Sequence, residues 1–559
     1  MKFFRPYSSN KTDNANDNKE NINTKEEKEK EKEKTKVKAP SIPKIKESDM
    51  PKNLNTYLGQ KGYTILKSEL LPSHQQFIKE QLLIKPCTPG APIQIDKSYP
   101  VYRESDKKLY VPRYYGEQLF GLPKETKISE GTDISLEFQG SLRDYQKPII
   151  EKYIQHVSNG GGGLLELFCG WGKSDSTLYV IGRLKKKTLI IVHKEFLMNQ
   201  WIERINKYYP DAKIGKIQGQ IIDIEGKDIV LGMLQSLSMK DYPASLFDSF
   251  GFTIIDEVHH ISSEVFSCAL FKLVTKYMLG LSATMERSDG TTRVFKMFLG
   301  DVVYKQERSK DEVVIVRGIT YQTNDDEFNE LELDFRGKPA SSKMLSKICN
   351  YNRRSEFILK VVEDMFLENP KQQIMIIASY RNILAYFFEA INFKKFATVG
   401  YYVGGMKESA LKLTELKQVV LATYSMAAEG LDIKTLTTLV MATPMTRIEQ
   451  SVGRILRQKH EKPPIVVDII DAHSNFQNQW LKRRRFFKAQ NYKIIQTTSS
   501  TYTTDISKWR VTFEPSLSKQ TPPSDDEGDE SGSDEEIGDD VGTVKSTSKG
   551  GVCLLKFKK

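Results

Sequence analysis

Short apolar runs that alternate with helix-like stretches are the feature of this chain that most restricts its fold. The first series lies within residues 164–284 and comprises LLEL, TLIIV, DIVLGM, FTIID and YMLGLSAT. Each run is brief and bounded, as is typical of strands that are buried on both faces of a sheet. Between the runs lie stretches with helical periodicity, such as EFLMNQWIERINKYY at residues 195–209.

A second series of the same kind begins near residue 370. It comprises QQIMIIAS, TVGYYVG, QVVLATY, TLVMAT and PIVVDII. Two such series predict two doubly wound α/β domains in tandem. Ligands of these sheets bind beyond the carboxyl ends of the strands, so functional residues are expected directly after each run.

The loop FCGWGKS, residues 168–174, follows the first run. Gly170 and Gly172 would let the backbone approach a ligand, so that amides and a helix N-terminus face phosphate oxygens. A strict phosphate loop has glycine six residues before its lysine, where this chain has Leu167. Read alone, the loop leaves a phosphate site and an ordinary strand-to-helix turn equally open.

The polar residues after two of the runs favour a nucleotide site. Lys173 is expected to reach the β- and γ-phosphates, and Ser174 to offer a hydroxyl ligand to Mg²⁺. Asp175 is unwelcome beside a triphosphate and could instead cap the helix. Asp256 ends the run FTIID, where it can hold Mg²⁺ through water, and Glu257 is placed to orient or deprotonate the attacking water. An acidic turn is the alternative for this pair, but together with Lys173 it predicts a MgATP site.

The segment RIEQSVGRILRQK follows a run of the second series. Gln450, Arg454 and Arg457 have helical spacing within it. Arg454 and Arg457 are one turn apart, so we expect both on one face, entering a cleft and neutralising charge on a transferring phosphoryl group. A basic surface helix is the alternative. Gly453 argues against it, because a surface helix prefers alanine and glycine indicates close backbone approach.

Charge is unevenly distributed along the chain, whose formal net charge is +11. Residues 525–540 hold ten acids and neither lysine nor arginine, so the remainder is strongly basic. A basic body suits a polyanionic partner, although a merely lysine-rich surface explains it equally well. The stretch WLKRRRFFKAQNYK, residues 480–493, either grips phosphates and stacks on bases or is a terminal helix that docks Phe486 and Phe487 on the second domain.

Composition excludes several classes of protein. No apolar run approaches the roughly 18 residues that a membrane span requires, and MKFFRPYSSN lacks the apolar core of a secretory signal. The cysteines show no metal-ligand spacing, which predicts reduced thiols in an intracellular setting without disulfides or zinc. They are Cys87, Cys169, Cys268, Cys349 and Cys553.

The ordered motifs resemble those of the superfamily-two helicases of DEAD/H type. Gln146 in SLRDYQ resembles the adenine-reading glutamine region of that family. In chain order, CGWGKS resembles motif I, VHKEFLMNQW motif Ia, DEVHH motif II, LSATMERSDG motif III, IMIIASY motif IV, ATYSMAAEGLDIK motif V and QSVGRILR motif VI. SATMERSDG is similar to the repair-and-transcription translocase branch. KKLYVPRYYG and VGYYVGGMK are similar to helicases of large cytoplasmic DNA viruses, including the poxvirus transcript-release helicase.

This resemblance implies two tandem RecA-like doubly wound parallel-sheet domains, α/β in class, preceded by a small α+β accessory domain. The low-complexity composition of both termini predicts that they are disordered. The expected divisions are a low-complexity Lys/Glu/Asn arm at 1–50, the accessory domain at 51–137, the ATP-binding domain at 138–320, the second RecA-like domain at 321–475, a basic extension at 476–516 and a disordered acidic tail at 517–559.

The resemblance also implies roles for individual residues. Lys173, Asp256, Glu257, Arg454 and Arg457 are the expected catalytic residues, with Ser174 and Asp256 holding Mg²⁺. The expected ATP-binding residues are Gln146, Cys169, Gly170, Trp171, Gly172, Lys173, Ser174, Asp175, Gly430 and Asp432. Those expected to couple the site to nucleic acid are His259, Ser282, Ala283, Thr284 and Gln450. Two departures from the family pattern are SDST after the lysine and Arg447 where an acid is more usual.

The implied activity is that of an ATP-dependent helicase or translocase that moves on, or unwinds, DNA or RNA by contacts to its backbone. Viral transcript release or repair is the expected setting, with RNA polymerase or another transcription protein as a partner and no membrane. A viral origin places the protein in the host cytoplasm and the virion, and any other origin in the nucleus. The alternatives are an RNA helicase proper and a nucleic-acid-binding scaffold with a decayed ATP site, for which Asp175 is the support.

Overall fold

The computed structural model describes residues 45–86, 98–287, 289–308, 313–429, 433–458 and 460–516. Most of the expected N-terminal arm (1–50) and the whole of the expected acidic tail (517–559) therefore lie outside the described residues. Gly430 and Asp432, expected near the nucleotide, also lie outside them. No helix within these described ranges has the length and apolar character needed to cross a membrane.

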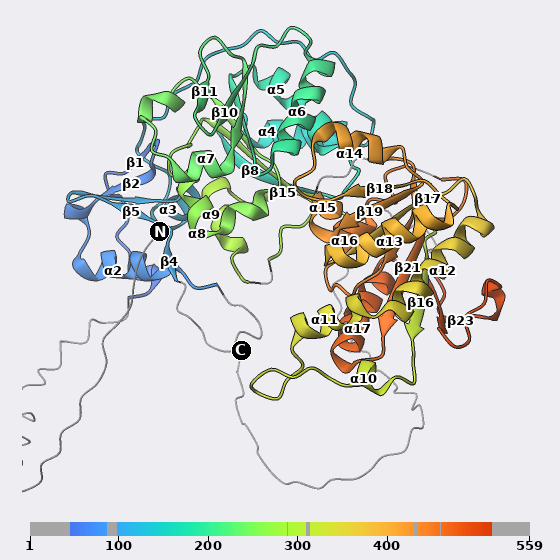
Figure 1. The fold of residues 1–559 in the computed structure, drawn as a ribbon. Coiled ribbons are helices and arrows are strands. Elements are labelled where there is room, and N and C mark those ends of the chain that lie inside the picture. Colours follow the sequence, from blue (N-terminus) through green and yellow to red (C-terminus); the bar gives the residue numbers. More distant parts are fainter. Residues whose placement is uncertain are drawn as a thin grey trace, which may run out of the picture. The chain divides into compact units, whose positions relative to one another are not determined.

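The N-terminal part is the expected small α+β arrangement (Figure 1). Its five-stranded sheet has the order β5-β6-β2-β1-β7, antiparallel except between β1 and β7. Helices α2 and α3 cover one face of this sheet. The elements are β1 (Tyr57–Gly59), β2 (Gly62–Leu66), α2 (Pro72–Gln81), β3 (Leu83–Ile84), β4 (Tyr99–Pro100), β5 (Arg103–Glu104), β6 (Lys108–Val111), α3 (Arg113–Phe120) and β7 (Glu125–Thr126).

The first large sheet has the order β11-β10-β12-β9-β13-β14-β8-β15, and all pairs except β10–β11 are parallel. Its strands are β8 (Gly161–Leu167), β9 (Thr188–Val192), β10 (Ile214–Gln218), β11 (Ile221–Asp223), β12 (Ile229–Met233), β13 (Phe252–Ile255), β14 (Tyr277–Ser282) and β15 (Val302–Gln306). The central strands are buried on both faces, as their continuous apolar runs predict.

Helices cover both faces of this sheet, so the first domain is doubly wound (Figure 1). One face is covered by α4 (Lys147–His156), α5 (Lys173–Leu184) and α6 (Glu195–Tyr208). The other is covered by α7 (Leu234–Met239), α8 (Glu264–Leu270) and α9 (Thr292–Leu299), and here the short β3–β4 pair of the accessory part also packs.

The second large sheet repeats this architecture, with the order β18-β19-β17-β20-β21-β16-β22-β23, and all pairs except β22–β23 are parallel. Its strands are β16 (Ile315–Tyr321), β17 (Gln373–Ala378), β18 (Val399–Tyr402), β19 (Val419–Thr423), β20 (Leu436–Met441), β21 (Ile465–Asp471), β22 (Lys493–Thr498) and β23 (Arg510–Phe513). Its helices are α10 (Asp326–Asn329), α11 (Ser341–Asn350), α12 (Asn352–Glu368), α13 (Arg381–Lys394), α14 (Glu408–Glu415), α15 (Tyr424–Glu429), α16 (Glu449–Val452) and α17 (Ser474–Ala489). The prediction of two tandem α/β domains is confirmed, and we call them the first and second lobes.

Three strands of the second sheet lie outside the apolar runs that were read as strands. β16 falls where the first α/β domain was expected to end, yet it pairs between β21 and β22. Its run is interrupted by Arg317, whose guanidinium forms an ion pair with Glu368 at 2.7 Å. β22 and β23 come from the segment expected to be a basic extension, and they complete the edge of the sheet.

Helix α17 decides between the two interpretations of residues 480–493. Trp480 and Phe487 are buried in the core of the second lobe, and Arg483 is 1% exposed. The Arg483 guanidinium donates to both carboxylate oxygens of Asp468, at 2.6 and 2.9 Å. These residues anchor a docked helix, and its exposed cations are Lys482, Arg485 and Lys488.

A second buried ion pair lies at the carboxyl end of β21. Arg354 and Asp471 are fully buried, and the Arg354 guanidinium donates to the two Asp471 oxygens at 2.6 and 2.8 Å and to the carbonyl of Ala442 at 2.9 Å. Removing one member of such a pair leaves an uncompensated buried charge. The resulting loss of folding stability exceeds the net stability that the intact pair contributes.

We therefore expect Arg354→Ala to lower the free energy of unfolding by about 3–5 kcal/mol. The measurement is urea denaturation, in which the midpoint should fall. The neighbouring Arg353 is exposed, so Arg353→Ala is the matched control and should leave the midpoint in place. Equal midpoints for the two variants would contradict a structural role for the pair.

Candidate active site

Three adjacent strands of the first sheet end where polar residues begin. β13, β14 and β8 are parallel neighbours, so their carboxyl ends meet at one edge of the sheet. β8 leads through the glycine loop to Lys173, β13 to Asp256, and β14 ends at Ser282. Residues far apart in the sequence are thus brought together where an open α/β sheet binds its ligands.

The glycine loop between β8 and α5 has the backbone that phosphate binding requires. Gly170 has φ 89° and Gly172 has φ 94°, a region that side chains disfavour. A Cβ at Gly172 would lie 2.6 Å from Nε2 of Gln146, so a side chain there would displace the Gln146 amide. Helix α5 begins directly afterwards at Lys173, which leaves its first amides available to an anion.

Two large side chains expected to bind nucleotide, Trp171 and Gln146, contribute to the packing and hydrogen bonding of this loop. Trp171 is 1% exposed and its indole packs in the core beneath the sheet. Gln146 is also buried; its amide donates to the Trp171 carbonyl at 2.8 Å and accepts from the Arg143 amide at 2.9 Å. Tyr145, not singled out from the sequence, is 47% exposed and its hydroxyl donates to the same Trp171 carbonyl at 3.3 Å.

Lys173, Asp256 and Glu257 converge at this edge. The Lys173 ammonium lies 3.8 Å from Oε1 of Glu257 and donates to the Leu167 carbonyl at 3.3 Å. The Asp256 carboxylate accepts from the Trp201 indole at 2.9 Å and from the Glu257 amide at 3.0 Å. Burial, followed by the charge of Glu257, raises the pKa of Asp256, while Lys173 opposes the shift.

This group of residues fits a Mg²⁺-bound triphosphate. Asp256 is buried beside a second carboxylate, so burial first and the charge of Glu257 second raise its pKa, and the charge of Lys173 does not cancel that rise. A divalent cation with oxygen ligands, which Asp256 and the Ser174 hydroxyl can supply, would offset that rise. Glu257 has φ 49°, an uncommon conformation for a side-chain-bearing residue, of the kind that persists at functional sites.

A chain of polar contacts leads from Glu257 to the end of β14. Oε2 of Glu257 lies 3.5 Å from Nδ1 of His259, and the same nitrogen lies 3.0 Å from the Ser282 hydroxyl. That hydroxyl donates to the Thr284 carbonyl at 2.7 Å. Arg287, which the sequence did not single out, donates to the His259 carbonyl and pairs with Asp289. Three of the residues expected to couple the site, His259, Ser282 and Thr284, are thus connected to Glu257.

Asp175, the departure from the family pattern, faces helix α6. Its carboxylate lies 3.7 Å from Nε of Arg204 and accepts from the Tyr208 hydroxyl at 3.3 Å. Both partners lie within residues 195–209, and no sequence motif links that stretch to the glycine loop. The side chain therefore links α5 to α6 and is directed toward cationic and hydroxyl partners.

The second lobe approaches the glycine loop through a turn. The expected helix over 447–459 is wrong in part, because α16 spans only Glu449–Val452 and turns follow it. A Cβ at Gly453 would lie 3.0 Å from Cβ of Cys169 in the first lobe. The close approach that Gly453 predicted is confirmed, and that contact is where the helix ends.

The two arginines of this turn point to different partners, which corrects the expectation that they share a helix face. Arg454 is buried and donates to the carbonyls of Ala427 and Ala428 in α15, at 2.7 Å for the former. Arg457 lies against the glycine loop, since a Cβ at Gly170 would be 3.7 Å from its Cα. Burial lowers the pKa of Arg457 to about 10.

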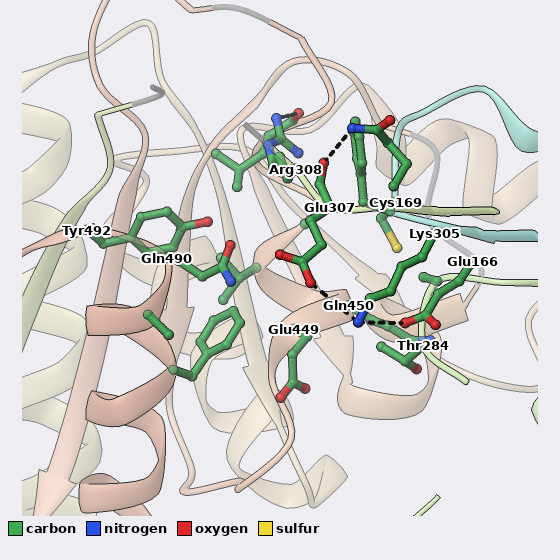
Figure 2. Close-up of a pocket in the computed structure, with 18 residues that line it drawn as sticks. Glu166, Cys169, Thr284, Lys305, Glu307, Arg308, Glu449, Gln450, Gln490 and Tyr492 are labelled. Carbon is green, nitrogen blue, oxygen red and sulfur yellow. Dashed lines mark hydrogen bonds and ion pairs between the residues drawn. The ribbon is translucent and has the colours of Figure 1, made fainter. Parts of the chain in front are cut away.

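A cavity of 390 Å³ lies beside this contact, lined by Cys169, Ala283 and Thr284 from the first lobe and by Gln450 and Gly453 from the second. Figure 2 shows Lys305 between Glu166 and Glu307, at 3.8 and 3.3 Å. The guanidinium of Arg308 lies over the ring of Phe168 and donates to the Leu456 carbonyl. The cavity adjoins the end of β15 in the first lobe, and its lining does not include Lys173, Asp256 or Glu257.

Comparison with known proteins agrees with this geometry. A model of the family described as "Type III restriction enzyme, res subunit" matches residues 139–287. The chain is 35% identical over 456 residues to the putative ATP-dependent RNA helicase L396 of Acanthamoeba polyphaga mimivirus, covering 80% of this chain and 87% of the relative. This decides the family. The chain belongs to the superfamily-two helicases.

Two further relatives extend the comparison. The helicase is 26% identical over 470 residues to the putative ATP-dependent RNA helicase QP509L of African swine fever virus, covering 78% of this chain and 91% of that one. It is 24% identical over 408 residues to the DNA 3'-5' translocase XPB2 of Sulfurisphaera tokodaii, covering 64% of this chain and 89% of the relative. The resemblance read from the motifs is confirmed, and the helicase is an ATP-dependent enzyme.

The direction of Asp175 generates a prediction. Because its carboxylate faces Arg204 and Tyr208, Asp175→Ala should lower the basal rate of ATP hydrolysis no more than about threefold, the scale of one exposed ion pair. Lys173→Ala, which removes the cation beside Glu257, should abolish hydrolysis in the same assay while leaving a folded helicase. A loss of a hundredfold or more in Asp175→Ala would contradict the assignment and place Asp175 on the nucleotide.

Proposed function

We propose that this helicase couples hydrolysis of MgATP to movement along, or unwinding of, nucleic acid, with a site completed by both lobes. The observation that carries the proposal is the position of Arg457, which lies against Gly170 of the glycine loop across the two lobes. A cation from the second lobe at the phosphates is what ties hydrolysis to the relative position of the lobes.

The first lobe would hold the nucleotide. The amides of Gly170 and Gly172 and the N-terminus of α5 face the phosphates, and Lys173 neutralises them. Ser174 and Asp256 would hold Mg²⁺. MgATP, when bound, supplies the phosphoanhydride bond whose hydrolysis releases free energy. Gln146 and Trp171 set the position of the loop through their contacts with each other.

Glu257 would orient or deprotonate the attacking water. Its left-handed backbone and its neighbours Lys173 and His259 fix the carboxylate at the carboxyl end of β13. Because His259 also contacts Ser282, a displacement of the β14 end by nucleic acid would be felt at the same carboxylate. This is a physical route by which a bound strand stimulates hydrolysis.

The two arginines of the turn would divide their roles. Arg457, next to the glycine loop, acts as the finger that stabilises charge on the transferring phosphoryl group. Arg454 is a positioning residue, since its guanidinium binds carbonyls of α15 and so fixes the turn from within the second lobe. Gly430 and Asp432 follow α15 directly, and we propose that they line the same cleft.

The nucleic acid would be tracked through its backbone, in keeping with the basic character of the chain. We further propose a role in transcript release or repair in a large DNA virus, with RNA polymerase or another transcription protein as partner and with location in the host cytoplasm and the virion. The viral origin of two relatives supports the viral setting. One relative is named an RNA helicase and another a DNA translocase. The deciding experiment is an ATPase assay in which single-stranded DNA, duplex DNA and structured RNA compete as stimulators.

Glu257→Gln should keep ATP affinity within a few-fold and lower turnover by on the order of a hundredfold or more, because an amide accepts no proton and positions water poorly. Equilibrium binding of a nonhydrolysable ATP analogue and steady-state hydrolysis measure the two effects separately. Equal losses of binding and of rate would show that Glu257 is structural and would count against its role as the base.

Arg457→Ala should lower turnover by about a thousandfold with a much smaller change in ATP affinity, because the finger acts on the transition state. Stimulation by nucleic acid should also be lost. Arg447, on the same segment but exposed, provides the matched control, and Arg447→Ala should leave both rates in place. Survival of basal and stimulated turnover in Arg457→Ala would refute a site completed by the second lobe.

A further inference from the structure

The face of the accessory sheet that α2 and α3 do not cover carries tyrosines in a row. In the strand register Tyr57 of β1 pairs with Thr64 of β2, and Thr64 pairs with Tyr110 of β6. Paired residues of neighbouring strands project from the same face. The residues that alternate with them form the core on the opposite face, and they include Leu58, Tyr63, Ile65, Leu109 and Val111.

Three lysines lie over these two rings. The Lys108 ammonium is 5.3 Å from the centroid of the Tyr57 ring and donates to the Tyr57 hydroxyl at 3.0 Å. The Lys127 ammonium is 4.7 Å from the same ring, and the Lys61 ammonium is 5.3 Å from the Tyr110 ring. Such positions reflect attraction between cations and aromatic faces. We call this set the tyrosine–lysine face.

The tyrosine–lysine face keeps a positive charge. Lys127 forms an ion pair with the exposed Glu125 at 2.9 Å, which offsets one of the three cations. The hydrogen bond to Tyr57 raises the pKa of Lys108, so this ammonium remains charged at neutral pH. Lys61 is exposed, and its ring partner Tyr110 is half-buried at the edge of the row. Three cations thus lie beside two rings on β1 and β6, and the strand between them, β2, contributes the buried Thr64.

Aromatic rings with cations beside them favour one class of partner. Single-stranded nucleic acid offers a base to each ring and a phosphate to each ammonium, and its affinity combines stacking with charge. Tyr57 and Tyr110 are separated by one strand, so their backbones lie about 10 Å apart, enough for each ring to take its own base. An acidic peptide would satisfy the lysines but would leave the rings without a stacking partner.

The accessory part is fixed to the first lobe, so a strand held there is held relative to the motor. The Tyr99 hydroxyl donates to the Ser262 carbonyl, and Tyr114 of α3 exchanges hydrogen bonds with the backbone of Gly162 at the start of β8. Met297 of α9 packs against the accessory core. Binding at the tyrosine–lysine face would retain a strand without touching the ATP site.

We propose that the tyrosine–lysine face is a second nucleic-acid site, outside the two lobes, that stacks bases of a single strand on Tyr57 and Tyr110 and binds its phosphates with Lys61, Lys108 and Lys127. The inference rests on the proposed function, because a motor that separates or tracks strands supplies the single strand.

The test is fluorescence anisotropy with the full chain, using labelled oligo(dT), oligo(U) and a duplex DNA of equal length. Tyr57→Ala combined with Tyr110→Ala should weaken binding of both single strands by tenfold or more, since stacking of each base contributes on that order. Duplex binding should change less than twofold, and basal ATP hydrolysis should be unchanged. Tyr57→Phe combined with Tyr110→Phe, which keeps the rings, should restore binding.

Tyr102 is the matched control within the accessory part. It also has an ammonium over its ring, that of Lys79, but Glu104 pairs with Lys79 at 2.9 Å and neutralises it. Tyr102→Ala should therefore leave single-strand affinity in place. Lys61→Gln combined with Lys127→Gln should reduce the slope of log affinity against log salt by about 0.7 for each phosphate that the protein no longer neutralises.

Several outcomes would overturn the proposal. Unchanged single-strand affinity in the alanine variant, or an equal loss for duplex and single strands, would exclude stacking on these rings. Binding of a peptide of residues 525–540 that depends on Lys61 and Lys127, with single-strand affinity unaffected by any of the substitutions, would show an acidic peptide as the occupant. Failure of the proposed function is distinguishable, since it would appear in the unmodified chain as hydrolysis that nucleic acid does not stimulate.

Discussion

The contact between the turn after α16 and the glycine loop of the first lobe is the constraint on which the rest of the site depends. Gly453 lies so close to Cys169 that a Cβ at Gly453 would be 3.0 Å from the Cβ of Cys169. The same turn brings Arg457 beside Gly170. Each doubly wound sheet places its functional residues at its own carboxyl edge. A site that needs both edges exists only when the lobes meet, so occupancy of the site and closure of the lobes are linked.

Within the first lobe, two features of the nucleotide site are unfavourable in free energy, and a bound ligand would offset them. Asp256 is a buried carboxylate with a raised pKa, and Glu257 has a left-handed backbone. Helix α6 lies between this site and the second lobe. It contacts Asp175 through Arg204, and it reaches α14 through Asn199, which donates to Glu408, and Glu203, which pairs with Lys412. Helix α6 therefore makes side-chain contacts with both α5 of the first lobe and α14 of the second.

The sequence predicted the fold where periodicity was unambiguous. Continuous apolar runs identified the central strands of both sheets, because burial on both faces leaves no room for polar alternation. β16 was missed since Arg317 interrupts its run, and the ion pair with Glu368 that makes this tolerable comes from α12. β22 was missed because it belongs to the segment 476–516, whose basic residues favoured a nucleic-acid-binding extension over a sheet edge. One of those residues, Arg483 of α17, is buried against Asp468.

The candidate site was predictable to the extent that it follows strand ends. Lys173, Asp256 and Glu257 come directly after strands and do converge, whereas the direction of Asp175 depends on Arg204 and Tyr208 of another helix. The placement of Arg454 and Arg457 on one helix face was wrong, because a tertiary contact at Gly453 ends the helix. Local spacing indicated which residues matter, and long-range packing determined where they point.

The contact between the lobes can be measured directly by cross-linking. Gly453→Cys places a thiol beside Cys169, and a small shift brings the two Cβ atoms to the roughly 3.5–4.5 Å that a disulfide needs. The disulfide-linked peptides should be found by mass spectrometry after mild oxidation, more rapidly with a nonhydrolysable ATP analogue, and should be absent when Cys169 is replaced by serine. An oxidised Gly453→Cys protein without this link, with or without the analogue, would contradict a site built by both lobes.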